Sequence, residues 1–330
     1  MEIKIYMKLI CNFGITFGLF LVPSSVFATQ SSLSSNYQQW YTGSLLSPSG
    51  ALRQGGVTIE PYISYNRPID SVDAFGHKGP IYGGTQSIVN TTLVKYGITN
   101  HLSVQLHPQF FYKWRSTYGN GGGQPRVGDL PLDFIWRFVD PNESRLIPAV
   151  MLQSGISFPT GRYDHLNSDK TNAGGNGNYV FRAALVTQST YRIAGHALRV
   201  RGWANIRKSV RDAEIHGISS YGTSKDFIGH AETGTSGEGG ISVEYGINQR
   251  WVLACDVARD WSYGSKVKGY NNAVDYVEKK GQGSGAWVVA PAVEYNWSAR
   301  YGIIAGVSTP FWGRNTTESL SGQVAFDMVF

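Results

Sequence analysis

The sequence predicts an all-β fold, an up-and-down antiparallel β-barrel of about 12 strands of the transmembrane, outer-membrane type. Three observations predict it. Apolar and polar residues alternate with period two along many segments, and the connections between these segments alternate between short and long. The chain of 330 residues has 40 glycines, 19 tyrosines and 9 tryptophans, but only 16% charged residues.

Residues 1–28 are typical of a cleaved signal peptide. Lys4 and Lys8 supply positive charge, residues 9–22 are apolar, and Val26-Phe27-Ala28 offers small residues to a signal peptidase. We expect the mature chain to begin at Thr29. An uncleaved membrane helix is the less favoured alternative, because the apolar core is shorter than the roughly 20 residues that span a bilayer. One mature cysteine, Cys255, would remain, so an intramolecular disulfide is excluded.

Residues 29–55 form a polar leader rich in serine and glycine, which we expect to lie in the periplasm. Within this leader, residues 36–46 are amphiphilic. We expect Trp40 and Tyr41 to anchor at the periplasmic rim or to act as a small plug. The barrel itself is predicted to occupy residues 56–330.

Period-two alternation locates the strands of the barrel. Val57, Ile59 and Ile63 alternate with polar residues, and Trp287, Val289 and neighbouring apolar residues repeat the pattern near the other end of the chain. Twelve strands are expected at residues 57–65, 85–97, 102–115, 128–139, 146–158, 179–191, 197–207, 234–246, 251–261, 285–297, 301–309 and 320–330.

The connections support closure of these strands into a barrel. Short turns such as "ITNH" and "INQR" alternate with long, glycine-rich loops at residues 66–84, 116–127, 159–178, 208–233, 262–284 and 310–319. Tight periplasmic turns and long outer loops are typical of outer-membrane barrels. An even number of strands places both chain ends on the periplasmic side. A sheet can span a bilayer only by closing on itself, because each backbone amide then finds a partner.

Aromatic residues on the apolar phase fall into two groups, one near each end of the strands. The outer group is Tyr65, Tyr112, Trp114, Tyr179, Trp261 and Trp287, and the periplasmic group is Tyr96, Phe138, Tyr191, Trp251, Tyr295, Trp297, Tyr301 and Phe330. Such girdles mark the two membrane interfaces. A secreted β-sandwich or propeller is the alternative, but its outward faces would be polar. The final Phe330 also indicates an assembly signal that the barrel-assembly machinery reads.

Three stretches resemble a known family: "YGITNHLSVQLHPQF", "VGDLPLDFIWRF" and "GISFPTGRY", in this order. The sequence resembles the outer-membrane proteins of the meta-pathway of phenol degradation, a group in Gram-negative bacteria that is often labelled as transporters. The resemblance implies passage of small, often hydrophobic or aromatic compounds across the outer membrane, and it implies no catalytic residue. Gly128, Asp129, Pro159, Thr160 and Gly161 carry the motifs, and they also have a structural interpretation as turn and loop anchors.

The opposite phase of the strands is expected to line the lumen. Its basic residues are Lys95, Lys113, Arg115, Arg137, Arg182, Arg199, Arg201 and Arg207, and its acidic residues are Glu60, Glu238, Glu244, Asp256, Asp260, Glu294 and Asp327. This order predicts a basic wall that faces an acidic wall, with Asp129 and Asp133 as exceptions that pair with Arg137 or Lys113. In one interpretation Arg199 and Arg201 hold a carboxylate or phenolate solute. In the other the charges pair across a narrow barrel. We expect a narrow, partly occluded pore.

Other function classes have weaker support in the sequence. An outer-membrane enzyme of the lipid hydrolase type needs a serine or aspartate beside a histidine, and none of the seven histidines shows such a pattern. No catalytic, cofactor or metal residue is therefore assigned. The net charge of +6 is spread along strands, which favours attraction to membrane lipid and lipopolysaccharide rather than nucleic acid. We expect a channel for passive uptake of a small-molecule solute, and a structural or adhesin-like barrel that acts through its loops remains the alternative.

Overall fold

The structure is a computed structural model that describes residues 38–81, 84–115, 123–142, 147–166 and 172–330. The predicted signal peptide and the first part of the leader lie outside the described residues. The described part of the chain contains nineteen β-strands and no α-helix. A search of these residues finds no helix with the length and apolar character to cross a membrane.

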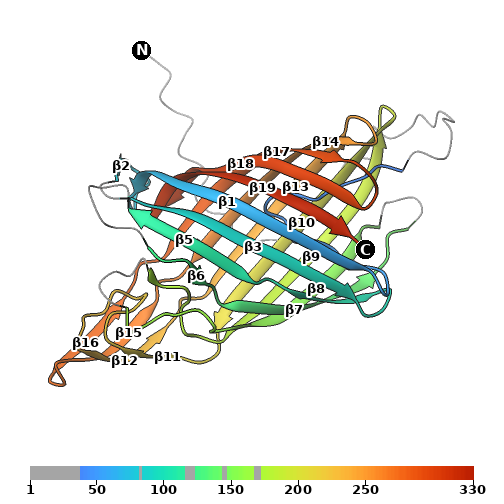
Figure 1. Ribbon diagram of the computed structural model, residues 1–330. Helices are drawn as coiled ribbons and strands as arrows, with labels where there is room; N and C mark the ends of the chain where they lie inside the picture. Colours follow the sequence, from blue (N-terminus) through green and yellow to red (C-terminus); the bar gives the residue numbers. More distant parts are fainter. Residues whose placement is uncertain (1–37, 82–83, 116–122, 143–146, 167–171) are drawn as a thin grey trace, which may run out of the picture. The chain divides into compact units, whose positions relative to one another are not determined.

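The strands close into an antiparallel barrel, which confirms the predicted fold class (Figure 1). With β4 and β5 counted as one strand, the twelve barrel strands of the described residues are β1 (Val57–Val72), β3 (Thr85–Gly97), β4 (Leu102–Leu106) with β5 (Gln109–Arg115), β7 (Leu130–Val139), β8 (Ala149–Phe158), β9 (Val180–Ile193), β10 (His196–Ser209), β13 (Ser236–Gly246), β14 (Trp251–Ser262), β17 (Ser284–Asn296), β18 (Tyr301–Arg314) and β19 (Thr316–Val329). The short strands β2 (Lys78–Pro80) and β6 (Arg126–Val127) extend the sheet beside β1 and β5.

Closure joins the two ends of the barrel sequence. The first strand, β1, pairs with β19 on one side and with β3 on the other. At the end of the β1–β19 pair, the Phe330 N–H donates to the Val57 carbonyl at 2.8 Å, and the Val57 N–H donates to the Phe330 carbonyl at 3.3 Å. A closed ring leaves no long edge with unpaired backbone groups.

All twelve predicted strands are present, with shifts at their ends. The third is interrupted at His107 and Pro108, since proline has no N–H to donate to a ladder. The predicted long loop at residues 310–319 is wrong. Strands β18 and β19 run through it and are separated only by Asn315, whose φ of 47° lies in the left-handed region that asparagine tolerates.

Two other predicted loops, at residues 208–233 and 262–284, contain regular structure instead. Their strands β11 (Ala213–His216), β12 (Phe227–Glu232), β15 (Lys266–Asn271) and β16 (Asp275–Lys280) form a separate four-stranded sheet. Both loops leave the same end of the barrel, because each follows a strand that runs in the same direction. The sheet is stable there because it has its own apolar core, formed by Ala213, Ile215, Phe227, Ala231 and Val267.

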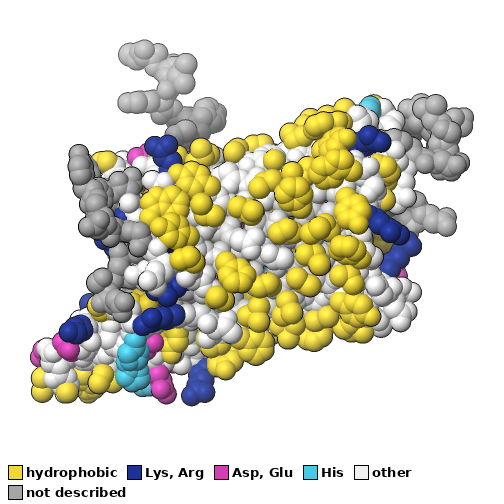
Figure 2. Space-filling view, viewed as in Figure 1, with side chains coloured by type: hydrophobic (Ala, Val, Ile, Leu, Met, Phe, Trp, Pro, Cys, Tyr) yellow, Lys and Arg dark blue, Asp and Glu magenta, His cyan; other side chains and the backbone are white. Residues whose placement is uncertain are grey.

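The two faces of the barrel wall differ in the way the alternation predicts. Exposed apolar side chains such as Leu253, Ile241 and Trp136 cover much of the outer surface (Figure 2). The predicted aromatic residues include ring pairs near both ends, for example Tyr65 with Trp114 and Tyr301 with Phe330. Buried residues of the opposite phase include many polar and charged ones, for example Asp133, Glu244 and Glu294, beside small and apolar ones. The barrel therefore carries an apolar exterior and a polar interior.

Candidate functional site

An extended segment, Thr42–Leu52, lies inside the ring of strands, and we refer to it as the inner segment. Its backbone N–H groups donate to side chains on strands that are far apart around the ring. Thr42 donates to Glu294 of β17 at 2.5 Å, and Leu46 donates to Asp256 of β14 at 2.8 Å. Leu52 donates to the Ser103 hydroxyl of β4 at 2.8 Å. A segment that bonds to opposite parts of a closed ring must occupy its interior.

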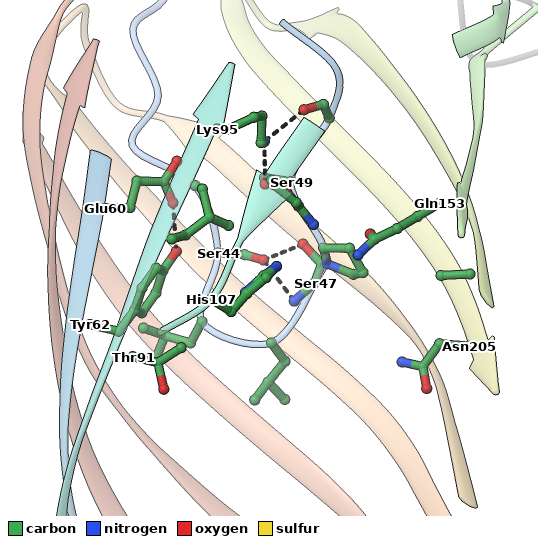
Figure 3. Close-up of a pocket in the computed structure, with 18 of the residues that line it drawn as sticks. Ser44, Ser47, Ser49, Glu60, Tyr62, Thr91, Lys95, His107, Gln153 and Asn205 are labelled. Atoms are coloured by element: carbon green, nitrogen blue, oxygen red, sulfur yellow. Dashed lines mark hydrogen bonds between the residues drawn. The ribbon is translucent and has the colours of Figure 1, made fainter. Parts of the chain in front are cut away.

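Basic side chains of the wall also bond to the inner segment, and Figure 3 shows the bonds of Lys95. Lys95 Nζ donates to the Ser49 hydroxyl at 2.5 Å and to the Gly50 carbonyl at 2.7 Å. Arg201 donates to the Ser47 hydroxyl at 2.5 Å and to the Pro48 carbonyl at 3.2 Å. Bonds in which one partner is ionised are stronger than neutral ones. The inner segment is therefore fixed by both cations and carboxylates.

Apolar contacts fill the space between these polar bonds. Leu45 packs in a buried cluster with small residues of the wall, namely Ala254, Ala290, Ala292 and Ala325, together with Ile304. Leu46 and Ala51 pack against a second buried cluster that includes Met151 and Trp203. The alanines matter because their short side chains leave room for a chain segment within the lumen. The segment thus blocks part of the barrel cross-section.

The proposed solute-binding ladder of Arg199 and Arg201 is not available in this structure. Arg199 forms a two-pronged ion pair with Glu244, which is its direct partner across the β10–β13 ladder. The Arg199 guanidinium also lies over the ring of Tyr41 at 3.9 Å. Arg201 bonds to Gln188 and to the inner segment. Both guanidinium groups are occupied by protein, so the prediction that they hold a solute is not supported in this state.

The sequence predicted that Asp133 would pair with Arg137 or Lys113. In the structure Asp133 pairs with Arg182 instead, at 3.1 Å. These two residues lie on β7 and β9, one on each side of Gly155 in β8. A Cβ atom at position 155 would lie 2.3 Å from the Asp133 carboxylate oxygen. The glycine therefore lets Arg182 reach across an intervening strand. Asp129, the other exception, accepts hydrogen bonds from backbone N–H groups instead.

The inner segment leaves a cavity of about 610 Å³ within the lumen. Eight of the fifteen predicted lumen residues line it: Glu60, Lys95, Arg182, Arg199, Arg201, Arg207, Glu238 and Asp327. Glu244, Asp256 and Glu294 are buried beside the inner segment or its partners.

The remaining four predicted residues lie elsewhere. Arg137 bonds to Asp140 and to the Asn100 carbonyl at a turn, and Lys113 approaches the Ala173 carbonyl of a loop at 3.4 Å. Asp260 accepts the Ala286 N–H, and Arg115 is exposed at the end of β5.

Several uncharged residues complete the cavity and were not assigned from the sequence. They include Tyr62, which donates to Glu60 at 3.2 Å, together with Thr91, Gln153 and Asn205 (Figure 3). His107 also lines the cavity and lies 3.5 Å from Asp133. The sequence signal that could have identified these residues is their position, since each places a polar side chain on the inward-facing phase of its strand. Within the described ranges, no group of three His, Cys, Asp or Glu side chains is arranged to hold a metal ion.

The motif residues of the family resemblance act together as an anchor at the loop end. The Asp129 carboxylate accepts N–H groups of Gly161 and Asn176, each at 3.0 Å. The Thr160 hydroxyl donates to the Gly128 carbonyl at 2.8 Å. Burial raises the pKa of Asp129, and the two backbone N–H donors oppose this rise. The structural interpretation of these residues, as turn and loop anchors, accounts for the contacts.

A closed barrel of twelve antiparallel strands, apolar outside and polar inside, defines the class of outer-membrane-type β-barrels. Among solved structures, an outer membrane channel from Pseudomonas putida F1 is similar, with 15% identity and a TM-score of 0.61, over 87% of this chain and 100% of that chain. The transport unit of the autotransporter AIDA-I from Escherichia coli matches with 10% identity and a TM-score of 0.50, over 88% and 95% of the two chains. No family model and no curated protein sequence matches the chain. At these identities the likeness shows the fold alone.

Proposed function

We propose that the protein is an outer-membrane channel for passive uptake of small solutes, and that the inner segment closes its lumen at rest. The observation that carries this proposal is the inner segment itself. It bonds to strands on opposite sides of the ring, and yet a cavity of about 610 Å³ remains beside it. Displacement of these eleven residues would join this cavity to both ends of the barrel, without any change in the wall.

The cavity lining favours solutes with polar or anionic groups. Arg207 lines the cavity, and in the described residues no carboxylate lies within 4.0 Å of its guanidinium. It takes over the role that the sequence suggested for Arg199 and Arg201, because a carboxylate or phenolate could meet it by charge-assisted hydrogen bonds. Small aromatic acids and phenols fit this lining, in agreement with the resemblance to the phenol meta-pathway family.

Insertion into the outer membrane follows from the same architecture. The apolar exterior and the aromatic residues near both strand ends match a bilayer and its interfaces. The predicted signal peptide at residues 1–28 would direct export, and Phe330 would serve as the assembly signal. Lipid, lipopolysaccharide and the barrel-assembly machinery are the partners that this route implies. We assign no catalytic residue to the chain.

Liposome swelling tests the channel proposal. Vesicles that contain the purified protein should swell in solutes of low mass, and a variant without Thr42–Leu52 should admit larger solutes at a higher rate. Arg207→Gln, with Arg115→Gln as a matched control outside the cavity, should slow benzoate relative to a neutral solute of equal size. Swelling that never exceeds that of empty vesicles, for either protein, would contradict a channel.

An adhesin-like barrel that acts through its loops is the second candidate. The four-stranded sheet of β11, β12, β15 and β16 favours it, because this sheet has an independent core and exposes Ile228, Tyr270 and Tyr276. Swelling experiments separate the two candidates, since only a channel conducts solutes.

A further inference from the structure

A second cavity, of about 810 Å³, lies outside the lumen, against the four-stranded sheet. Its walls are the loop before β12, the connection from β14 to β15, and the end of β16. Pockets that hold small-molecule ligands usually have volumes of about 300–1,000 Å³. The cavity is therefore large enough for a ligand of two or three rings.

The charge of this cavity is wholly positive. Lys279 and Lys280 line it, and its lining contains no aspartate or glutamate. Two acidic residues of the sheet have lysine partners of their own: Glu278 pairs with Lys268 at 2.8 Å, and Glu232 pairs with Lys266 at 3.0 Å. In the described part of the chain, no ion pair involves either Lys279 or Lys280. Two adjacent cations without a protein counter-charge favour an anionic ligand.

Strand geometry sets the direction of Lys279. Val277, two residues earlier on β16, packs against the core cluster of the sheet. Side chains two residues apart in a strand point to the same face. Lys279 therefore extends from the core-facing side of the sheet into the cavity, whereas Glu278 and its partner Lys268 lie on the opposite face.

Hydroxyl and amide groups make up most of the remaining lining. They belong to Ser220, Thr223, Ser224, Ser265, Asn271 and Gln282. Of the apolar side chains in the lining, Phe227 is 2% exposed and Val267 is 6% exposed. The exception is the ring of Tyr263, which is 68% exposed. This lining suits a polyhydroxylated anion better than an aromatic acid, which would need an apolar slot.

We propose that this cavity binds an acidic sugar, such as a uronic acid unit of a glycan. The sugar carboxylate meets Lys279 through charge-assisted hydrogen bonds, and Lys280, which lines the cavity at the end of β16, adds positive charge. Its hydroxyl groups bond to the serine, threonine and amide side chains, and the C–H face of one ring lies on Tyr263. This site is separate from the lumen, so its function does not depend on conduction through the barrel.

Calorimetric titration of the full-length protein in detergent tests the proposal, with trigalacturonate, neutral maltotriose and benzoate as probes. Trigalacturonate should bind at least tenfold more tightly than maltotriose or benzoate. The double variant Lys279→Gln/Lys280→Gln should weaken trigalacturonate binding at least tenfold, as should Tyr263→Ala. Lys268→Gln, on the opposite face of the same sheet, should change it less than twofold. Variants are compared only when they keep the heat-dependent gel shift of a folded barrel.

An acidic sugar can come from a free glycan or from lipopolysaccharide, and a second titration separates these sources. It uses purified lipopolysaccharide whose core contains uronic acid. Binding of lipopolysaccharide but not of trigalacturonate, with loss in the double lysine variant, supports the site and assigns it to the lipid. Equal binding of maltotriose and trigalacturonate, tighter binding of benzoate, or no binding of either acidic sugar would overturn the proposal.

Discussion

Lys95 Nζ donates a hydrogen bond to the carbonyl oxygen of Gly50 at 2.7 Å, and this contact ties β3 of the barrel wall to the inner segment. Lys95 is only 2% exposed, and the hydroxyl of Ser49 accepts a second bond from the same nitrogen. A buried ammonium needs such partners, because desolvation of a charge is costly. If the inner segment moved away, the buried Lys95 ammonium would lose both of these hydrogen-bond partners.

Removal of this cation should release the inner segment. The variant Lys95→Met loses two charged hydrogen bonds, each worth about 1.5–3 kcal/mol. Loss of even one such bond would shift the open-to-closed ratio by roughly tenfold or more. Single-channel recordings should show longer or more frequent open periods than in the unaltered protein. Lys113→Met, which removes a lysine that contacts a loop, is the control and should leave the record unchanged. An identical record for both variants would mean that Lys95 does not hold the segment.

The Arg199–Glu244 pair should be essential to the stability of the barrel. Truncation of one partner of a buried ion pair leaves an uncompensated charge and costs about 3–5 kcal/mol. Arg199→Ala should therefore lower the temperature at which the folded band disappears in heat-modifiability gels. The double variant Arg199→Met/Glu244→Leu should recover most of the loss. If Arg199→Ala melts like the unaltered protein, the pair is not buried as the structure shows.

The barrel could be predicted from the sequence, because the alternation of apolar and polar residues and the lengths of the turns are local signals. Val57–Tyr65 and Leu102–Trp114, for example, show their outward phase without reference to any other strand. The ion-pair and hydrogen-bond partners of the side chains could not be predicted, since they depend on the register between neighbouring strands. Asp133 reaches Arg182 only because Gly155 lies between them in the ladder. For the inner segment, the sequence suggested only that the leader could act as a small plug. An extended chain that bonds to side chains rather than to a strand has no periodic pattern, so its contacts could not be predicted.

The four-stranded sheet was missed for a different reason. Its strands have four to six residues each, and glycines and lysines interrupt their apolar residues. Such short segments resemble solvated loops until their partners are known. Ile215 and Phe227 become recognisable as core residues only when β11 pairs with β12.

The outward phase of the barrel strands should be sensitive to charge. Val257 lies in the middle of β14 and is 38% exposed. An arginine at the lipid midplane of a barrel costs about 2–4 kcal/mol. Val257→Arg should therefore lower the yield of folded protein in lipid vesicles. Ile228→Arg, at an exposed position on β12 outside the barrel, should fold normally. Equal yields would place Val257 in water rather than lipid.

Tyr221 should ionise at a higher pH than a tyrosine in open solution. Burial raises the pKa of Tyr221 to about 12, and its phenol oxygen is held by Asn178, Thr233 and the Asn176 carbonyl. An exposed phenol has a pKa of about 10, so the folded state holds this proton more tightly than the unfolded state. The resulting stability is complete below about pH 10 and is lost as the pH rises toward 12.

Absorbance at 295 nm during alkaline titration measures this ionisation. Subtraction of the Tyr221→Phe titration from that of the unaltered protein should leave one phenol that ionises near pH 12. Tyr263→Phe, a change at an exposed tyrosine, is the control and should leave the ionisation near pH 12 in place. A Tyr221 difference curve centred near pH 10 would show that this side chain is open to water.

Single-channel conductance of the full-length protein and of a variant without Thr42–Leu52 tests the central claim most directly. Water should replace the inner segment around Glu294, Asp256 and Lys95, so the wall should remain folded. We expect small or rare conductance steps for the full-length protein and steps several times larger for the variant, both from protein that keeps the gel shift of a folded barrel. Equal conductance of the two folded proteins would contradict a lumen closed by the inner segment.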